Sequence, residues 1–426
     1  MSNMNSLLAE LTWRGLLYQH TEPLDAALEA GVVTGYCGFD PTAPSLHVGN
    51  LVPVMGLTHL QRAGHRPVVL IGGGTGMIGD PSGKTAERQL NTPETVEANS
   101  RAIQAQLERF LEFGEPHGAI MRDNAEWLLE MKAVEFMRDV GKHFTVSYMM
   151  QKESVRSRME EGGISYTEFS YMLLQAKDFL ELYRRVRCTL QIGGSDQWGN
   201  ITAGIELVRR VAGAEAHALT MPLVTTAAGT KFGKTEAGAV WLDPKLTSPY
   251  KFLQFWVNVD DRDASRFLRY FTLLEREEIE ALELEIAAHP ERRAAQQALA
   301  RDVTTRVHGE GAARAAADVS ALLFGRGEAG ALSAEALEAL RDEVPFVEIP
   351  SLEAEGIDGV DLFVAAKLAP SKGAARRLLE QGGLSVNGKK LNAEERVVRS
   401  DSMLVGRHLL LRKGAREYAL VRVGGW

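Results

Sequence analysis

The feature that most limits the possible folds is a strand–helix–strand pattern near the N-terminus. An apolar run at 32–39 predicts a buried strand, and residues 46–63 predict a helix that ends before Gly64. A second apolar run at 66–71 predicts another strand. Two strands joined through a helix form a parallel pair, and such units build sheets that are covered by helices. We therefore expect an α/β fold with a parallel sheet here.

The character of the chain changes twice after this first part. From residue 246 the apolar positions recur at helical spacing with few strand signals, and Pro350 and Gly356 then indicate a break between domains. The last residues combine a helical pattern with a strand and an Asn-Gly turn at 387–388. The expected order is a parallel-sheet domain at 1–245, an all-helical domain at 246–345, a linker at 346–359 and a small α+β domain at 360–426.

Charge is distributed unevenly between the body of the chain and its end. Residues 360–426 carry thirteen Lys and Arg against six Asp and Glu, a net charge of +7. Since the whole chain carries −8, residues 1–359 carry −15. A compact basic module on an acidic protein is what binding to a phosphate backbone requires, although charged faces also serve solubility.

Cysteine usage and hydropathy exclude several classes of protein. Cys37 and Cys188 are too few for a disulfide framework or a structural zinc site, which favours a reducing compartment. The N-terminus lacks a signal-peptide pattern, and no apolar run approaches the roughly 18–20 residues of a membrane span. We expect a cytoplasmic protein with no membrane contact.

A glycine-rich run at 72–79 follows the second predicted strand and contains the spacing G-x-G-x-x-G. A dinucleotide site would need a helix to begin there, but residues 80–83 continue the loop and add the carboxylate of Asp80. A P-loop would need glycine where the chain has Ile78. Two interpretations remain: a flexible loop at the sheet edge, or a loop that brings Asp80 close to a small ligand.

Two further motifs suggest phosphate chemistry. The sequence HVGN at 47–50 follows the first strand, so we expect His47 and Gly49 in the first turn of the helix, where backbone N–H groups favour an anion. The sequence GTKFGKT at 229–235 places two lysines on a short loop, which suits a polyphosphate. Alone, each has a simpler explanation: a structural histidine and a solvated turn.

In this order the two motifs resemble the signature sequences of class I aminoacyl-tRNA synthetases. The match extends over nearly the whole chain, and further segments resemble the bacterial tyrosyl-tRNA synthetases. These segments are YCGFDPTA at 36–43, GDPSGKT at 79–85, GKHF at 141–144, TEFSYMLLQAKDF at 167–179 and LQIGGSDQWGNI at 190–201. The resemblance implies a Rossmann-like catalytic domain with a dimer-contact insertion at about 125–190, a helical anticodon-arm domain and an S4-like RNA-binding domain.

The resemblance also implies an activity. Members of this family activate L-tyrosine with ATP to tyrosyl-adenylate and pyrophosphate, and then transfer the tyrosyl group to the 3′ end of tRNA(Tyr). ATP enters as a substrate with Mg²⁺, so we expect no prosthetic group and no metal site built from the protein alone. A homodimer is implied as well.

The family pattern carries over to particular residues of this chain. The implied catalytic residues are Thr42, His47, Lys84, Arg88, Lys231, Lys234 and Thr235. The implied tyrosine-binding residues are Tyr36, Asp80, Tyr171, Gln175, Asp178 and Gln197. The implied ATP and ribose residues are Cys37, Gly38, Asp40, His47, Gly49, Asn50, Gly194, Asp196 and Lys234. The implied RNA-binding residues are Lys372, Arg376, Arg377, Lys389 and Lys390.

The chemistry of these residues agrees with the implied roles. Tyr171, Gln175 and Asp178 have i, i+4, i+7 spacing and share one helix face, and Asp80 supplies a carboxylate for an ammonium group. Simpler interpretations remain, since Tyr171 could be core and Asp178 an exposed helix residue. The family's usual second signature histidine is Asn50 here, which can donate a hydrogen bond but cannot become a cation.

Three other functions compete with this one. The tryptophan-specific sister enzymes would not need two polar groups, Tyr36 and Asp178, for a phenol. A catalytically idle RNA-binding protein would not need His47 and the two loop lysines. A different ligase or nucleotidyltransferase on the same fold would not need the helical and basic domains.

Overall fold

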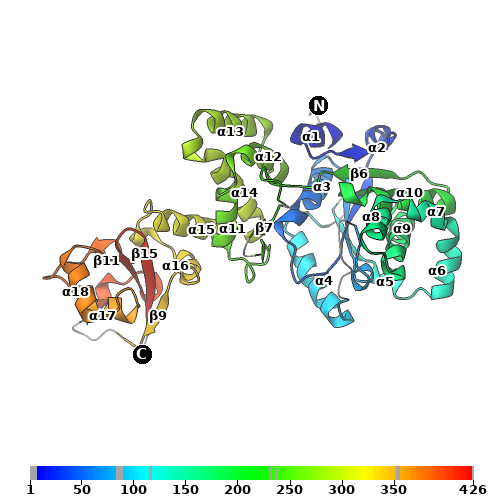
Figure 1. The fold of residues 1–426 in the computed structure, drawn as a ribbon. Helices are drawn as coiled ribbons and strands as arrows, with labels where there is room; N and C mark the ends of the chain where they lie inside the picture. The colour runs from blue at the N-terminus through cyan, green and yellow to red at the C-terminus, as the bar shows by residue number, and fades with distance from the viewer. Residues whose placement is uncertain are drawn as a thin grey trace. The chain divides into compact units, whose positions relative to one another are not determined.

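The structure of the chain is a computed structural model, shown in Figure 1. It describes residues 7–82, 90–114, 118–230, 232–235, 238–351 and 356–424. The chain forms two compact units, which are described separately. The first comprises Met1–Asp243 and Asp260–Ala295, and the second comprises Pro244–Val259 and Gln296–Trp426. Within the described ranges no helix is long and apolar enough to cross a membrane.

A six-stranded sheet forms the centre of the first unit and confirms the predicted fold class. Its order is β1 (Gln19–His20), β6 (His217–Met221), β5 (Cys188–Gly194), β2 (Thr34–Phe39), β3 (Arg66–Ile71) and β4 (Ile120–Asp123). All neighbouring pairs are parallel except β1 with β6. The chain turns back at β2, which has β3 on one side and β5 on the other. In open α/β sheets such a switch point leaves a crevice at the carboxyl ends of the strands.

Helices cover both faces of this sheet, as the alternation of side chains along β2 requires. On one face, Tyr36 packs edge-on against Phe179 of α9 (Tyr166–Val186), with ring centroids 5.2 Å apart. On the other face, α3 (Leu51–Arg62) approaches so closely that a Cβ at Gly35 would lie 3.0 Å from Leu60 Cδ2. Glycine at this position therefore lets α3 pack directly on the strand.

Shorter elements complete the first unit. Its remaining helices are α1 (Leu7–Arg14), α2 (Leu24–Ala30), α4 (Pro93–Leu107), α5 (Ala125–Leu128), α6 (Ala133–Asp139), α7 (Val146–Met150), α8 (Glu153–Glu161), α10 (Trp198–Ala212), α12 (Asp261–Phe271) and α13 (Arg276–Ala288). A small hairpin joins β7 (Lys234–Thr235) to β8 (Gly238–Ala239). Since α12 and α13 belong to this unit, the helical segment predicted at 246–345 is shared between the two units.

The second unit combines helices with a five-stranded sheet. The helices are α11 (Pro249–Val257), α14 (Ala294–His308), α15 (Glu310–Leu323), α16 (Ala334–Arg341), α17 (Gly359–Ala365) and α18 (Lys372–Glu380). The sheet has the order β12 (Lys389–Lys390), β11 (Leu384–Val386), β14 (His408–Lys413), β15 (Glu417–Val423) and β9 (Phe346–Ile349), and β10 (Ile357–Asp358) pairs with β13 (Val397–Val398). The predicted Asn387-Gly388 turn joins β11 to β12 with positive φ at both residues.

The segment predicted as a linker at 346–359 is partly a strand instead. Residues Phe346–Ile349 form β9 and pair in parallel with β15 from Leu420 onward. This pairing joins residues about seventy positions apart, so local sequence signals could not reveal it. The strand ties the C-terminal sheet to the helices that precede it.

Both faces of β15 are buried. Tyr418 and Leu420 pack among residues of α15 and α16, while Ala419 and Val421 pack with residues of α17 and α18. The Tyr418 hydroxyl also donates to the carbonyl oxygen of Leu322, at 3.1 Å. The C-terminal sheet is thus the common core of the second unit.

We expect Leu420→Ala to destabilise α15, α16 and the C-terminal sheet together. Leu420 is fully buried, and truncating a buried leucine costs about 2–5 kcal/mol. Hydrogen exchange on the full chain should show faster opening in both the helices and the sheet. Faster exchange in the sheet alone would contradict a shared core.

Candidate active site

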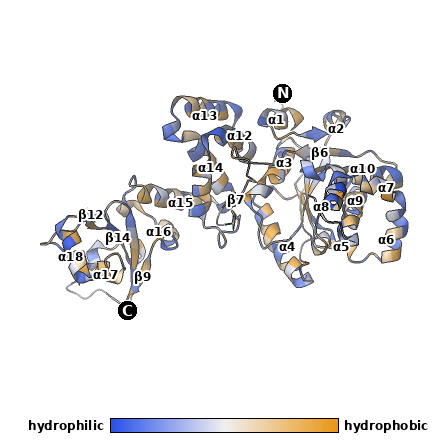
Figure 2. Cartoon of the chain, in the orientation of Figure 1, coloured by the Kyte–Doolittle hydropathy of each residue, from blue (hydrophilic) through white to orange (hydrophobic). Residues whose placement is uncertain are grey.

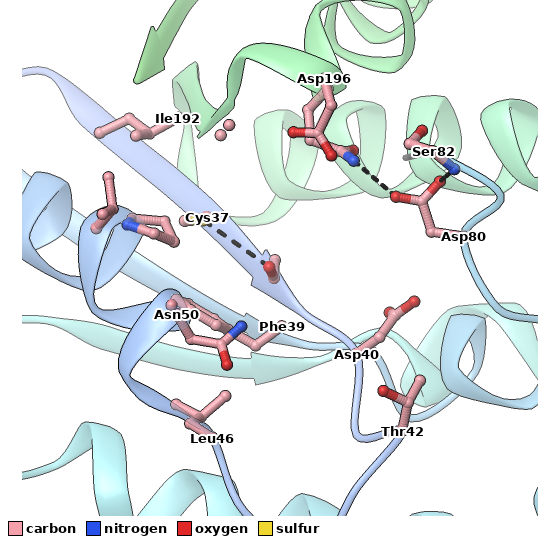
Figure 3. Close-up of a pocket in the computed structure, with 18 of the residues that line it drawn as sticks. Cys37, Phe39, Asp40, Thr42, Leu46, Asn50, Asp80, Ser82, Ile192 and Asp196 are labelled. Carbon is pink, nitrogen blue, oxygen red and sulfur yellow. Dashed lines mark hydrogen bonds between the residues drawn. The ribbon is translucent and has the colours of Figure 1, made fainter. Parts of the chain in front are cut away.

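A pocket of about 630 Å³ lies at the carboxyl ends of β2 and β5, where the strand order switches (Figure 3). It is lined by every predicted tyrosine-binding residue and by every predicted ATP-binding residue that the structure describes in full. Thr42 and His47 of the predicted catalytic set also line it. Lys84, Arg88 and Lys231 lie outside the described residues, and Lys234 and Thr235 are described only as the backbone of β7.

The Asp178 carboxylate is held at the inner end of this pocket. Trp127 Nε1 donates to Oδ1 at 2.8 Å, and Asn124 Nδ2 donates to Oδ2 at 2.9 Å. Asp178 is only 2% exposed, and burial raises the pKa of its carboxyl to about 8, although the two donors act in the opposite direction. Neither Asn124 nor Trp127 was predicted from the sequence, because their place at the carboxyl end of a parallel strand becomes evident only once β4 pairs with β3.

Tyr36 supplies a second polar group in the same pocket. Its side chain is 1% exposed, and its hydroxyl has no hydrogen-bond partner within the described part of the chain. Burial and the nearby Asp178 raise the pKa of the Tyr36 phenol well above its ordinary value, so the hydroxyl keeps its proton. A buried hydroxyl without a partner is costly, and a polar ligand group would relieve that cost.

A chain of hydrogen bonds runs from Asp178 along the pocket. Asn124 Nδ2 also donates to Thr75 Oγ1 at 2.8 Å, and Thr75 Oγ1 donates to Asp40 Oδ1 at 2.7 Å. The other Asp40 oxygen accepts from the Tyr171 hydroxyl at 2.8 Å. Gly72 makes this possible because a Cβ there would collide with Asp40 Oδ1. The glycine-rich loop therefore serves close packing around the pocket.

A second polar group surrounds Asp80. Gln197 Nε2 donates to Asp80 Oδ2 at 2.6 Å, and the backbone N–H of Ser82 donates to Oδ1 at 2.9 Å. Asn200, which the sequence analysis missed, donates to Gln175 Oε1 at 3.0 Å. Figure 3 shows Asp80 and Asp196 across the pocket from Asn50. Of the two interpretations of the glycine-rich loop, the structure supports the one that brings Asp80 to a pocket.

His47 lies just before the helix rather than in its first turn. Residues Val48–Asn50 form a 3₁₀ turn that precedes α3. His47 Nδ1 accepts from the backbone N–H of Gly49 at 3.0 Å, and Asn50 Oδ1 accepts from the backbone N–H of His47 at 3.0 Å. Since Nδ1 accepts, the ring proton belongs on Nε2, which makes that nitrogen a donor.

The structure brings the two signature motifs together. Gly233 has φ +80°, and a Cβ there would lie 2.7 Å from Val48 Cγ2 in the HVGN turn. Phe232 is buried and stacks on Phe271 of α12, with ring centroids 5.1 Å apart. Phe232 thus anchors the segment between the two lysines, while Gly233 permits contact with the turn.

The predicted RNA-binding residues belong to the second unit. Lys372, Arg376 and Arg377 lie on α18 and are exposed. Lys389 and Lys390 form the exposed strand β12. Lys372 also pairs with Asp361, with 2.6 Å between Nζ and Oδ1. Basic side chains that project from a helix and a neighbouring hairpin suit contact with RNA phosphates.

Known proteins resemble this chain over its whole length. The family model for class I tRNA synthetases (W and Y) matches residues 29–325, and that for the tyrosine–tRNA ligase SYY-like C-terminal domain matches 336–421. The tyrosine–tRNA ligase of Anaeromyxobacter dehalogenans is 53% identical over 420 residues, which cover 99% of this chain and all of the relative. The tyrosine–tRNA ligase of Geobacillus stearothermophilus is 53% identical over 422 residues, 98% of this chain and 99% of the relative.

The fold also resembles solved structures of tRNA synthetases. A C-terminally truncated mitochondrial tyrosyl-tRNA synthetase from Aspergillus nidulans has a TM-score of 0.68 and 30% identity, and the match covers 75% of this chain and 94% of that one. A tryptophan-bound tryptophanyl-tRNA synthetase from Encephalitozoon cuniculi has a TM-score of 0.53 and 12% identity, covering 71% and 86% of the two chains. The second likeness concerns the fold alone.

We expect Asp178 to make the stability of the protein depend on pH. Its folded pKa of about 8 exceeds the ordinary value of 3.8, so between these values the unfolded chain releases a proton that the folded chain keeps. Its contribution to stability is therefore present at low pH and is lost as the pH rises from about 4 to about 8. Urea unfolding of wild type and Asp178→Asn measures this effect. As the pH rises across this range, the free energy of unfolding of the wild type should fall relative to that of Asp178→Asn. Parallel pH profiles would contradict the raised pKa.

Proposed function

The chain belongs to the class I tRNA synthetases and, within them, to the tyrosine–tRNA ligases. From this premise we propose how its substrates bind in the pocket. The enzyme activates L-tyrosine with ATP to tyrosyl-adenylate and pyrophosphate, and then transfers the tyrosyl group to the 3′ end of tRNA(Tyr). The arrangement rests chiefly on the two buried polar groups, Tyr36 and Asp178, at one end of the pocket.

The phenol of the substrate is placed against Tyr36 and Asp178. Asp178 already accepts from Trp127 and Asn124, and its oxygens have further lone pairs for the phenol hydroxyl. The unpartnered hydroxyl of Tyr36 supplies the second contact. The phenol hydroxyl can donate to Asp178 and accept from Tyr36, whereas the indole N–H of tryptophan only donates, which supports tyrosine as the amino acid.

The ammonium group of the substrate is placed at the other polar group. The Asp80 carboxylate is held by Gln197 and Ser82, and Gln175 and Tyr171 line the pocket nearby. Side-chain oxygens of Gln175, Gln197 and Tyr171 line the pocket near the Asp80 carboxylate. This set of acceptors suits an ammonium group, which donates three hydrogen bonds. Tyrosine bound in this way is fixed at both ends.

ATP is placed beside the HVGN turn. An oxygen of the tyrosine carboxylate attacks the α-phosphorus, the bond to the bridging oxygen of the β-phosphate breaks, and pyrophosphate leaves with that electron pair. His47 Nε2–H and Thr42 Oγ1 line the pocket as donors to the phosphate oxygens, and Asn50, whose Oδ1 is occupied by the cap, offers its amide N–H groups. Gly38, Cys37, Gly194 and Asp196 would surround the ribose.

The remaining phosphate contacts are assigned to cationic side chains that the structure does not describe, Lys84, Arg88, Lys231 and Lys234, together with Thr235. Mg²⁺ would arrive bound to ATP, because this cation is usually held through substrate phosphates rather than by a cage of protein ligands. The ion would neutralise phosphate charge.

Binding of tRNA is assigned to the second unit and to the helical segment 246–345, which the two units share. The basic residues of α18 and β12 would bind RNA phosphates, and the helical part at 246–345 would face the anticodon arm. The match of residues 336–421 to the C-terminal domain of tyrosine–tRNA ligases supports this assignment. The cytoplasm is the proposed location because tRNA charging occurs there in bacteria.

A homodimer is proposed through the segment 129–166. This segment exposes seven large apolar side chains: Leu129, Val134, Met137, Val146, Met150, Met159 and Tyr166. The helix α6 has no fully buried residue and carries both hydrophilic and hydrophobic positions (Figure 2). Exposed apolar residues gathered in one segment mark a protein–protein contact.

Amino-acid-dependent exchange of labelled pyrophosphate into ATP tests the activation step. We expect exchange with tyrosine, and none with tryptophan or without amino acid. Aminoacylation of tRNA(Tyr) with labelled tyrosine then tests the transfer step. Exchange that tryptophan supports equally well would overturn the assignment.

We expect Tyr36→Phe to narrow the preference for tyrosine over phenylalanine. The variant removes a hydroxyl that contacts only the phenol, so activation of phenylalanine should change little. Tyr171→Phe is the matched control. The Tyr171 hydroxyl lies at the proposed ammonium end, so its loss should lower the activation of tyrosine and of phenylalanine equally. The ratio of kcat/KM values in pyrophosphate exchange measures both effects. If Tyr36→Phe lowered kcat/KM equally for both amino acids, the phenol would not bind at this end of the pocket.

We expect Val134→Asp to weaken the dimer by at least about tenfold in Kd, because it places a charge among apolar contacts. Val134 is 77% exposed in the single chain. Leu284→Asp is the control, because Leu284 is 72% exposed on α13 of the same unit but lies outside 129–166. Sedimentation velocity over a range of concentrations reports the association. Equal behaviour of the two variants would argue against this interface.

A further inference from the structure

A second cavity, of about 450 Å³, lies beside the edge strand β4 of the first unit. Three arginines from different elements line it: Arg66 from the start of β3, Arg122 from β4 and Arg185 from the end of α9. Its other described lining residues are apolar or glycine, with no Asp or Glu among them. Among the described residues, none lines both this cavity and the catalytic pocket.

Arg122 occupies a position where an apolar side chain would be expected. In the sheet it pairs with Leu70, and its neighbour Ile120 on the same face pairs with Val68. Leu70 and Val68 belong to the core under α9. Arg122 is half-buried, and within the described residues its side chain has no hydrogen-bond or ion-pair partner. A cation held partly out of water without an anion is costly, so this position favours a bound anion.

The other two arginines are already engaged. Arg66 Nε donates to the carbonyl oxygen of Gly118 at 3.2 Å, which fixes its guanidinium at the cavity. Arg185 pairs with Glu181 at 3.3 Å and with Glu126 at 3.5 Å. These two carboxylates offset part of the positive charge from outside the cavity. The attraction for an anion therefore depends most on Arg122.

Arg185 also connects this cavity to the catalytic pocket. Its guanidinium lies over the ring of Trp127, 5.1 Å from the centroid, and Trp127 Nε1 donates to Asp178. An anion that draws Arg185 toward the cavity would change its stacking on Trp127. The position of the Trp127 N–H, and with it the Asp178 carboxylate, would change in turn.

We propose that this arginine pocket, formed by Arg66, Arg122 and Arg185, binds the phosphate group of a small anion and transmits its occupancy to Asp178 through Trp127. Guanidinium groups match phosphate oxygens through paired N–H donors. Inorganic phosphate, pyrophosphate and small phosphate esters share this chemistry, and the cavity has room for a group larger than a single phosphate.

The test is a ³¹P NMR titration of the full chain with three probes: inorganic phosphate, pyrophosphate and GMP. The catalytic pocket can also bind these probes, so the comparison is between variants. Arg122→Gln removes the unpaired charge, and Arg122→Lys keeps a charge. Arg101→Gln is the matched control, since Arg101 is exposed on α4 and only pairs with Glu97.

The probe should bind to this site in the wild type, in Arg101→Gln and in Arg122→Lys. In Arg122→Gln the Kd for the probe at this site should rise by at least about tenfold. The probe that binds most tightly identifies the source of the phosphate. Equal binding by Arg122→Gln and Arg101→Gln would overturn the site. Saturation with that probe should also shift the Kd for tyrosine at least about twofold in the wild type but not in Arg122→Gln. The same shift in both proteins would overturn the proposed coupling between the arginine pocket and Asp178.

Discussion

The catalytic unit depends on the burial of one carboxylate. Asp178 is removed from water, a change that costs several kcal/mol unless hydrogen bonds replace the lost hydration. Two N–H donors, Trp127 Nε1 and Asn124 Nδ2, supply those bonds. Asn124 directly follows β4 and Trp127 lies on the next helix, α5, while Asp178 lies on α9. The pairing of β4 with β3 and the packing of α9 on the sheet must therefore both be correct for the site to exist.

Asn124 joins this carboxylate to the rest of the pocket. Its Oδ1 accepts from the backbone N–H of Gly74 at 2.7 Å, and its Nδ2 serves both Asp178 and Thr75. Through Thr75 and Asp40 the network reaches Tyr171, at the end of the pocket proposed for the ammonium group. One amide side chain thus contacts the glycine-rich loop, the Asp178 carboxylate and the hydrogen-bond path that leads to Tyr171. Such a fully bonded network holds the pocket in shape before substrate binds.

The sequence predicted those parts of the fold that local patterns determine. The crossover at 32–71 gave the parallel sheet, and the spacing of Tyr171, Gln175 and Asp178 placed them on one face of α9, where all three line the pocket. The roles of these residues in binding stay predictions. The predicted contact of the HVGN and lysine motifs with one pocket followed from the resemblance, and the structure brings their backbones together at Gly233.

The parts that were missed depend on contacts distant in sequence. Asn124 and Trp127 become partners of Asp178 only when β4 joins the sheet, and nothing within 119–128 reveals that pairing. In the same way, the local sequence of β9 predicts a linker, because its partner β15 lies about seventy residues later. Short strands at sheet edges carry little local signal, and their identity is set by the neighbour they find.

The central claim is that Asn124 and Trp127 give Asp178 its selectivity for a hydroxyl. Calorimetric Kd values for tyrosine, phenylalanine and ATP in wild type, Asn124→Ala and Asn200→Ala test it most directly. The account predicts that Asn124→Ala lowers the tyrosine-to-phenylalanine affinity ratio by about tenfold or more and leaves ATP binding nearly unchanged, while Asn200→Ala weakens both amino acids alike. An unchanged ratio in Asn124→Ala would contradict it.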